Sequence, residues 1–177
     1  MIELAELKKW LHYSPLAGVF EWRRSGHAIR AGALAGSVCK DTGYIEVRLR
    51  GKHYKAHHLA WIYMTGVWPE SDIDHKDGDR TNNAFGNLRL ATKSQNQWNK
   101  RLSKASTSGV KGVNYDRPTR KWRATVGMDD KKVHVGLFKT KEEAELAVKE
   151  KRTELHGEFA NHGLHGYEIE ELENASL

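Results

Sequence analysis

Hydrophobic and polar positions divide the first half of the chain into a helix, a hairpin and a second helix. Leucine and tryptophan recur at helical spacing through residues 3–12, which predicts a short helix. Apolar and charged residues alternate through 43–49, and a glycine-containing turn leads into 53–55, so we expect a β-hairpin with a basic outer face. Residues 57–65 return to helical spacing, and Gly66 then supplies a stop signal.

The pattern in the second half predicts three strands followed by one helix. Strand-like runs at 110–115, 121–127 and 132–138 are separated by short polar segments of turn-like composition. Residues 140–143, Thr-Lys-Glu-Glu, form a capping box, and the segment after them carries an apolar stripe. We therefore expect a three-stranded antiparallel sheet packed on one helix, after a polar linker at 101–109.

These elements indicate the α+β class and a modular chain. A length of 177 residues allows one ordinary domain or a few small modules, each of which buries a modest fraction of its surface. The expected organisation is an N-terminal helix and β-hairpin segment at 1–56, a central core at 57–100, the linker at 101–109, a sheet-plus-helix module at 110–162 and an acidic tail at 163–177.

Charge narrows the partners that the protein can have. The formal net charge is +6 with a pI near 9.4, which favours a polyanion. Between residues 100 and 139, eleven lysines or arginines stand against three aspartates, a net charge of +8. Nucleic acid is the leading partner, and an anionic membrane surface is the alternative.

Cysteine content and hydropathy argue for a cytoplasmic protein. The single cysteine, Cys39, excludes an internal disulfide framework and a cysteine-rich zinc site. No run approaches the ~18 apolar residues of a membrane span. Glu3 and Glu6 stand where a secretory signal would carry basic residues, so we expect no membrane association.

Carboxylate, imidazole and amide side chains gather in residues 73–99. Asp74 and His75 are adjacent, and amides follow at Asn87 and Asn96. Cleaving a phosphodiester needs an activated water, and stabilisation of charge on the phosphate and the departing oxygen. His75 can act as the base because an unperturbed imidazole titrates near neutral pH. Asp74 and Asn96 offer oxygen ligands, which suit one Mg²⁺ or Mn²⁺ better than zinc.

Local geometry sets a condition on this site. Adjacent residues of a strand point to opposite faces, so Asp74 and His75 can serve one site only if the strand ends or twists there. Residues 92–95 have the pattern of a capping box, which places Asn96 in the first turn of a helix.

The aspartate-rich segment has two other interpretations. Such segments are commonly plain surface turns. A calcium loop is the second alternative, but counting back from Gly78 puts Ile73 and His75 where that loop needs carboxylates. The calcium pattern therefore fails.

The joint pattern of Asp-His, Gly-Asp-x-Thr-Asn-Asn, Asn-Leu-Arg and Ser-x-Asn resembles the HNH nucleases over roughly residues 50–100. That family has a ββα-metal site, a hairpin with a long loop followed by a helix. The resemblance implies that Asp74 is a metal ligand, that His75 is the general base and that Asn87 holds the loop and orients the base.

The last position of the motif is an asparagine rather than the histidine of the family name. This variant is found in many phage and intron-encoded members, and it makes Asn96 the second metal ligand by resemblance. His57 matches an upstream histidine that is often seen in phage-type members. We assign His57 no catalytic role.

The C-terminal module has features of a DNA-binding sheet. Alternation on 121–127 turns Trp122, Ala124 and Val126 toward the helix. It leaves a basic outer face with Lys121, Arg123 and Thr125, to which the next strand adds Lys132 and His134. A small sheet can enter the major groove. The alternative is that these charges form only a solvated surface.

Four short motifs in this module resemble the Apetala and ethylene-response-factor type of DNA-binding domain over about 108–161. They are Gly112-Val113, Lys121-Trp122, Val135-Gly136-Leu137-Phe138 and the Glu-Glu-Ala helix start. By that resemblance the DNA-facing positions are Lys111, Asn114, Arg123, Thr125, Lys132 and His134. The plant proteins carry other residues at several of these positions, so no sequence preference is inferred.

Together these observations predict a metal-dependent DNA endonuclease, encoded by a phage or mobile element and acting in the cytoplasm of a bacterial host. It would use one Mg²⁺ or Mn²⁺, act on double-stranded DNA and leave 5′-phosphate and 3′-hydroxyl ends. A homodimer is one way to cut both strands. The alternatives are a non-catalytic DNA-binding regulator on a nuclease scaffold, and a structure-selective or RNA-directed nuclease.

Overall fold

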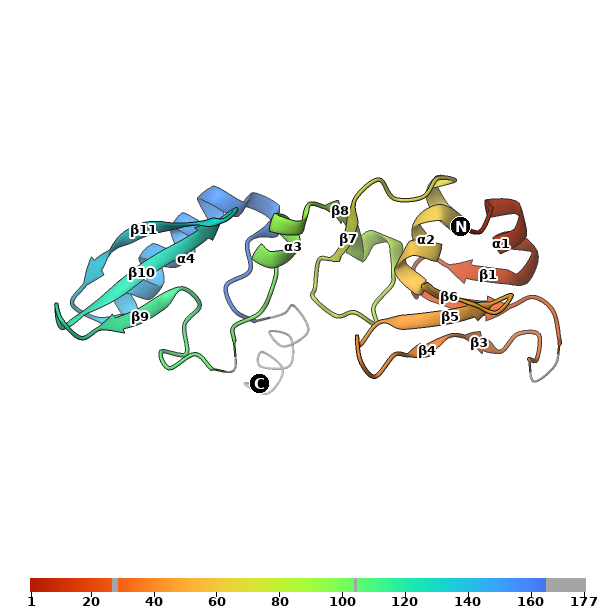
Figure 1. Ribbon diagram of the computed structural model, residues 1–177, viewed down its shortest axis with the longest axis horizontal. Helices are drawn as coiled ribbons and strands as arrows, with labels where there is room; N and C mark the ends of the chain where they lie inside the picture. Colours follow the sequence, from red (N-terminus) through yellow and green to blue (C-terminus); the bar gives the residue numbers. More distant parts are fainter. Residues whose placement is uncertain (27–28, 104, 165–177) are drawn as a thin grey trace. The chain divides into compact units, whose positions relative to one another are not determined.

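The computed structural model describes residues 1–26, 29–103 and 105–164 and divides the chain into two compact units (Figure 1). The first unit is Met1–Ala91, and the second begins at Thr92. Most of the predicted acidic tail, and Lys104 of the predicted linker, lie outside the described residues. The division precedes the predicted linker, and the domain limits given above stay predictions.

The first unit contains two α-helices, one 3₁₀ turn and three small antiparallel sheets within its described residues. The helices are α1 (Leu4–Trp10) and α2 (Ala56–Thr65), and the 3₁₀ turn is η1 (Phe85–Asn87). The sheets are β1 (Leu11–Ser14), β2 (Val19–Trp22) and β3 (Leu34–Ala35); β4 (Ser37–Val38), β5 (Ile45–Leu49) and β6 (Lys52–Lys55); and β7 (Asp72–His75) with β8 (Leu88–Ala91).

The first helix ends earlier than the sequence predicts. The apolar spacing continues to Leu11, but α1 stops at Trp10 and the chain enters β1 directly. Leu11 pairs with Trp22 of β2, and Leu11 and Tyr13 are buried while His12 is exposed. A pairing partner beyond the local window therefore overrides the helical pattern.

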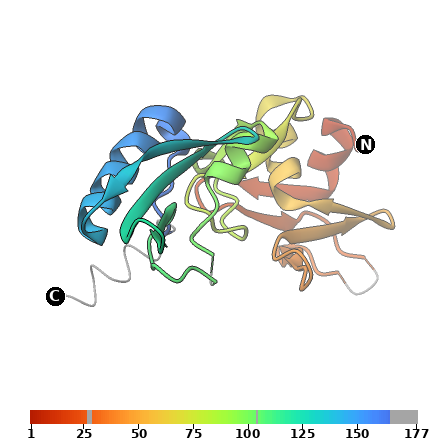
Figure 2. The ribbon, with the colours of Figure 1, turned by 60° about the vertical axis from the view of Figure 1, so that its left-hand side comes forward.

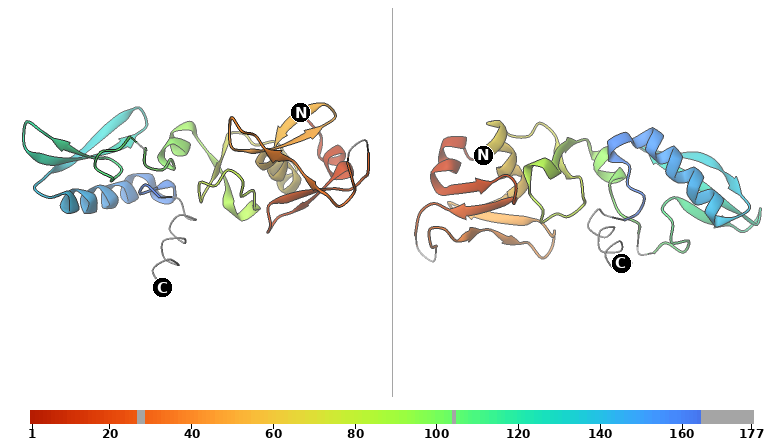
Figure 3. Two further views of the ribbon diagram at one scale, coloured as in Figure 1. Left: turned by 90° about the horizontal axis from the view of Figure 1, so that it is seen from below. Right: turned by 180° about the vertical axis from the view of Figure 1, so that it is seen from behind.

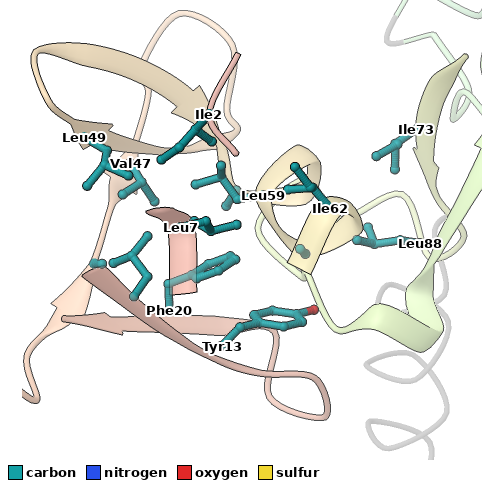
Figure 4. Close-up of a cluster of buried hydrophobic side chains, with 14 residues drawn as sticks. Ile2, Leu7, Tyr13, Phe20, Val47, Leu49, Leu59, Ile62, Ile73 and Leu88 are labelled. Atoms are coloured by element: carbon teal, nitrogen blue, oxygen red, sulfur yellow. The ribbon is translucent and has the colours of Figure 1, made fainter. Parts of the chain in front are cut away.

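Helix α2 lies at the centre of the core of the first unit (Figure 4). Leu59 and Ile62 are buried, and the helix ends at Gly66 in the left-handed conformation, as the stop signal predicts. The strands of the first two sheets contribute Tyr13, Phe20 and Val47, and the Tyr13 and Phe20 rings stack with centroids 4.6 Å apart. Ile73 of β7 and Leu88 of β8 complete the cluster, so the core extends to the β7–β8 hairpin.

The second unit is a three-stranded sheet with a helix along one face (Figures 2 and 3). Its described elements are α3 (Lys93–Trp98), β9 (Val113–Asp116), β10 (Lys121–Met128), β11 (Lys131–Phe138), α4 (Lys141–His156) and η2 (Gly157–Phe159), with the sheet in the order β11-β10-β9. Ala124 and Val126 of β10 pack with Ala144 and Val148 of α4 in a separate core.

Capping sets the start of α3 and of α4. Thr92 caps α3 and Thr140 caps α4, each through a complete capping box, as the sequence predicts. The first strand starts later than expected, at Val113, because the Ser108 hydroxyl holds the preceding turn by donating to the carbonyl of Val113. The α+β class is confirmed. None of the described helices is long and apolar enough to span a membrane.

Candidate active site

The β7–β8 hairpin positions the Asp74–His75 pair. The two strands are antiparallel, with Asp74 opposite Arg89 and His75 opposite Leu88. Directly paired residues share a face, so Asp74 lies on one face and His75 on the other. Strand β7 ends at His75, where the chain leaves the sheet for the loop 76–84.

Asp74 forms a cross-strand ion pair with Arg89. The Nε and Nη2 atoms of Arg89 donate to Asp74 Oδ2 at 2.9 and 2.8 Å, and both side chains are largely buried. Arg89 thus places a fixed positive charge beside the candidate ligand. Sequence reasoning missed this contact, because the cross-strand register depends on the conformation of the intervening loop.

His75 lies on the face of the hairpin that joins the core. Its side chain is buried, and its Nε2 lies 3.2 Å from Asn83 Oδ1. The Asn83 amide nitrogen donates to the carbonyl of Thr81, which makes Oδ1 the acceptor toward His75. This network assigns the Nε2-protonated tautomer, in which Nδ1 carries the lone pair that can accept a proton.

Burial holds His75 neutral. Desolvation lowers its pKa below the ordinary value, and the Asn83 hydrogen bond and the nearby carboxylates, led by Asp77, offset only part of that effect. A neutral imidazole is the form that can act as a base.

Two aromatic groups pack around His75. His57 of α2 lies edge-on to its ring with centroids 5.1 Å apart, and Tyr44 lies 5.8 Å away. His57 is 3% exposed, and its Nδ1 has no hydrogen-bond partner among the described residues. Burial, followed by repulsion from His58, His75 and Lys55, lowers the pKa of His57 to about 2.

Asn87 fastens both ends of the loop. Its Oδ1 accepts from the backbone N–H of Asp77 at 3.1 Å, and its Nδ2 donates at 2.9 Å to Asp77 Oδ1 and to the carbonyl of Asn82. Asp77 Oδ1 also accepts from the N–H of Asp79, and Asp77 Oδ2 accepts from the Asn82 amide. The side chain predicted to hold the loop thus binds its backbone, while Asn83 hydrogen-bonds the candidate base.

The loop is also fastened to the N-terminal sheet. The Tyr13 hydroxyl donates to the carbonyl of Asn83 at 2.6 Å, and the N–H of Phe85 donates to the carbonyl of Pro15 at 2.9 Å. Gly18 has a φ of +69°, and a Cβ there would lie 2.2 Å from the backbone N of Ala84. The N-terminal segment therefore braces the residues that hold His75.

Asn96 lies in the first turn of α3, as the capping box predicts, and is half-buried. It belongs to the second unit, so its meeting with Asp74 stays a prediction. The described residues contain no group of three or more histidine, cysteine or acidic side chains that could hold a metal. One carboxylate and one amide suit an oxygen-preferring ion that keeps water and phosphate as its other ligands.

The outer face of the C-terminal sheet gathers most of the predicted DNA-facing residues. Arg123 pairs with Asn114 and with Leu137, Thr125 with His134, and Gly127 with Lys132, so these positions share a face with Lys121. Thr125 is half-buried, and the other residues on this face are exposed. The residues that share the face are Asn114, Lys121, Arg123, Thr125, Lys132, His134 and Leu137.

Arg123 and Lys111, both of the predicted DNA-facing set, use their charged groups in contacts within the unit. The Nη2 of Arg123 donates to Asp116 Oδ1 at 2.7 Å, which partly neutralises its charge. Lys111 lies outside the sheet, before β9, and its ammonium donates to the carbonyls of Trp98, at 2.8 Å, and Lys100. Burial, followed by repulsion from Arg152, lowers the pKa of Lys111 to about 8.

Comparison with known proteins places the hairpin and its loop in a recognised domain. The family described as HNH endonuclease matches residues 54–98, which include Asp74, His75, Asn87 and Asn96. Protein 3.8 of Escherichia phage T7 is 37% identical over 113 residues, which are 60% of this chain and 91% of that protein. No solved structure matches the chain significantly. The chain therefore belongs to the same family as this phage protein and carries an HNH endonuclease domain.

Proposed function

We propose that the protein is a metal-dependent DNA endonuclease that hydrolyses phosphodiester bonds. The observation that carries the proposal is a buried carboxylate, Asp74, followed directly in the chain by a buried neutral imidazole, His75, where β7 ends inside the HNH match. The braced loop fixes this arrangement before substrate binds, because Asn83 and Asn87 are both hydrogen-bonded within it. Preorganised groups of this kind are what a hydrolytic site requires.

His75 acts as the general base in this proposal. With Nε2–H donated to Asn83 Oδ1, the imidazole accepts a proton from the attacking water at Nδ1. The resulting imidazolium is stabilised by the Asn83 oxygen and by the carboxylates of Asp77 and Asp74, each of which favours the charged form of His75. The water attacks phosphorus in line, and the bond to the 3′-oxygen breaks.

Asp74 and Asn96 would hold one Mg²⁺ or Mn²⁺. When bound, the ion supplies positive charge to the phosphate and to the departing 3′-oxygen. A carboxylate has lone pairs on both of its oxygens, so acceptance from Arg89 at Oδ2 is compatible with cation binding by the same group. Arg89 keeps the Asp74 carboxylate oriented, and its charge adds to the attraction for the phosphate.

The exposed basic face of the C-terminal sheet would bind the DNA duplex. Lys121, Lys132 and His134 project from one face, opposite the face that α4 covers. Lysines so placed neutralise backbone phosphates, which gives affinity that depends on salt. We expect the recognised duplex to be held by this sheet while the hairpin cuts it. Cutting of both strands would then require two cuts, by a dimer or in sequence.

Incubation with supercoiled plasmid tests the proposal. Wild type should nick or linearise the plasmid with Mg²⁺ or Mn²⁺ and not with EDTA, and it should leave 5′-phosphate and 3′-hydroxyl ends. His75→Ala should bind the same DNA and cut at a rate lower by about 10²- to 10⁴-fold. Cleavage by wild type in the absence of any divalent ion would contradict the metal-dependent mechanism. Wild type that binds DNA but does not cut it with any divalent ion would replace this proposal with the non-catalytic DNA-binding regulator.

A further inference from the structure

A cavity of about 380 Å³ lies in the second unit. Its walls come from α3, from the segment before β9, from the end of β10 and from the last turns of α4. Nothing in the proposed cleavage chemistry uses this cavity. Its lining includes three cationic side chains, Lys93, Lys111 and Arg152.

Arg152 is buried and Lys111 is half-buried, and neither contacts a carboxylate among the described residues. Arg152 is 2% exposed, and it donates to the carbonyl of Lys111 at 2.6 Å and to His162 Nδ1 at 3.2 Å. The ammonium of Lys111 donates to the carbonyls of Trp98 and Lys100. Within the part of the chain that the structure describes, every hydrogen bond of these two cations goes to a carbonyl or an imidazole.

Burial of positive charge without an anion is unfavourable. A buried cation loses its hydration, and an anion in contact with it normally offsets much of that loss. The pKa values of both groups respond to this environment: burial lowers that of Arg152, and burial with repulsion from Arg152 lowers that of Lys111 to about 8. The cluster therefore has a local excess of positive charge that a bound anion would relieve.

An imidazole and an indole form another wall of the cavity. The rings of Trp98 and His156 stack with centroids 4.4 Å apart and an interplanar angle of 7°. His156 Nε2 donates to the carbonyl of Gly127 at 2.6 Å, and its Nδ1 is buried without a hydrogen-bond partner among the described residues. Trp98 therefore reports directly on what enters the cavity.

Two aspartates at the cavity carry negative charge, opposite in sign to the lysines and the arginine. Asp129 and Asp130 lie in the exposed turn between β10 and β11. Their carboxylates repel an anion, whereas they would attract a cation. Substitution of either aspartate therefore reveals the sign of the ligand charge.

We propose that this cavity binds a phosphate group of the DNA strand, as a contact separate from the cleavage site. An ammonium has three N–H donors, and Lys111 uses two of them on carbonyls, so the third can donate to a phosphate oxygen. Lys93, exposed in the first turn of α3, supplies a second donor. The identity of the anion as DNA rests on the proposed function, and the α3 wall of the cavity, which includes Lys93 and Trp98, belongs to the C-terminal end of the HNH match.

The test compares two single-lysine variants in DNA binding. Lys93 is exposed, so Lys93→Gln removes a cavity charge without disturbing the backbone contacts that Lys111 makes. Lys139→Gln is the matched control, because Lys139 is an exposed lysine of the same unit outside the cavity. Both changes are made in the full chain with His75→Ala, so that the duplex is not cut.

We expect Lys93→Gln to weaken binding of a short DNA duplex and to make the slope of log K against log salt shallower by about 0.9, which corresponds to one phosphate contact. Lys139→Gln should leave the slope near that of the parent. Asp130→Asn should tighten binding, because it removes a repulsive charge. Equal effects of the two lysine variants, or weaker binding by Asp130→Asn, would overturn the proposal.

A second measurement observes the cavity itself. Sodium phosphate, titrated against sodium chloride at equal ionic strength, should shift the indole N–H resonance of Trp98, assigned by its loss in Trp98→Phe. The shift should be smaller in Lys93→Gln, and an unmoved Trp98 resonance would contradict the proposal. These binding measurements do not depend on cleavage. If wild type does not cut DNA but Lys93→Gln still weakens binding, only the proposed nuclease function is refuted. If wild type cuts DNA but Lys93→Gln binds as the parent does, only the proposed phosphate site is refuted.

Discussion

His57 makes the stability of the first unit sensitive to acid. Its imidazole is 3% exposed and its pKa in the folded protein is about 2, whereas in the unfolded chain it returns to about 6.5. Below pH 6.5 the unfolded state therefore binds a proton that the folded state does not. The free energy of unfolding must fall as the pH drops from 6.5 toward about 2, and it is unaffected by this group above pH 7.

The size of the effect follows from this linkage. Between pH 7 and pH 5 the folded His57 stays neutral, so the loss is set by protonation of the unfolded chain and amounts to about 2 kcal/mol. His57→Phe keeps an aromatic ring against Tyr44 and His75 and removes the titrating group. The variant should lose about 2 kcal/mol less than wild type over this interval. His58 and His75 contribute equally to both proteins and cancel in the difference.

Urea titrations at pH 7, 6 and 5 measure this difference. A pulse of hydrogen exchange at fixed pH, read on peptides from α2, reports the unfolding of the first unit alone. Wild type and His57→Phe with the same loss between pH 7 and 5 would refute the reasoning, because they would show that His57 is protonated in the folded protein as readily as in the unfolded chain.

Three further substitutions test other contacts. Arg89→Met leaves the Asp74 carboxylate buried without its arginine and should lower the free energy of unfolding in urea by about 3 kcal/mol. The Asp74→Asn/Arg89→Met double variant should recover part of this loss, and an equal loss in both variants would contradict the ion pair. Gly112→Ala places a Cβ 2.3 Å from the carbonyl oxygen of Thr125 at a φ of +80° and should lower the melting temperature of the second unit, whereas an unchanged value would contradict this packing. Lys132→Ala should weaken DNA binding for all sequences and reduce the salt slope by about 1; a sequence-dependent loss would indicate base contact instead.

Local sequence patterns predict the elements that depend on neighbouring residues. The capping boxes at Thr92 and Thr140 set the helix starts, and the position of Asn96 in the first turn of α3 follows from the first of them. Alternation along β10 likewise gives the buried positions of Ala124 and Val126. These features need no knowledge of distant segments.

Features that join distant segments could not be predicted in this way. The Asp74–Arg89 pair and the Asn83 contact to His75 depend on how the loop 76–84 folds. The end of α1 depends on the pairing of Leu11 with Trp22. A pattern of residue types indicates which groups have the chemistry for cleavage, and the pairing of strands decides how they face one another.

Chemical rescue of His75→Gly by imidazole tests the proposed base most directly. The variant should cut plasmid more slowly than wild type by about 10²- to 10⁴-fold in Mg²⁺. Added imidazole should restore part of the rate, because it can accept the proton that Nδ1 of His75 accepts in wild type, and it should leave Asp74→Ala inactive. Cleavage by His75→Gly at the wild-type rate without imidazole would contradict the role assigned to His75.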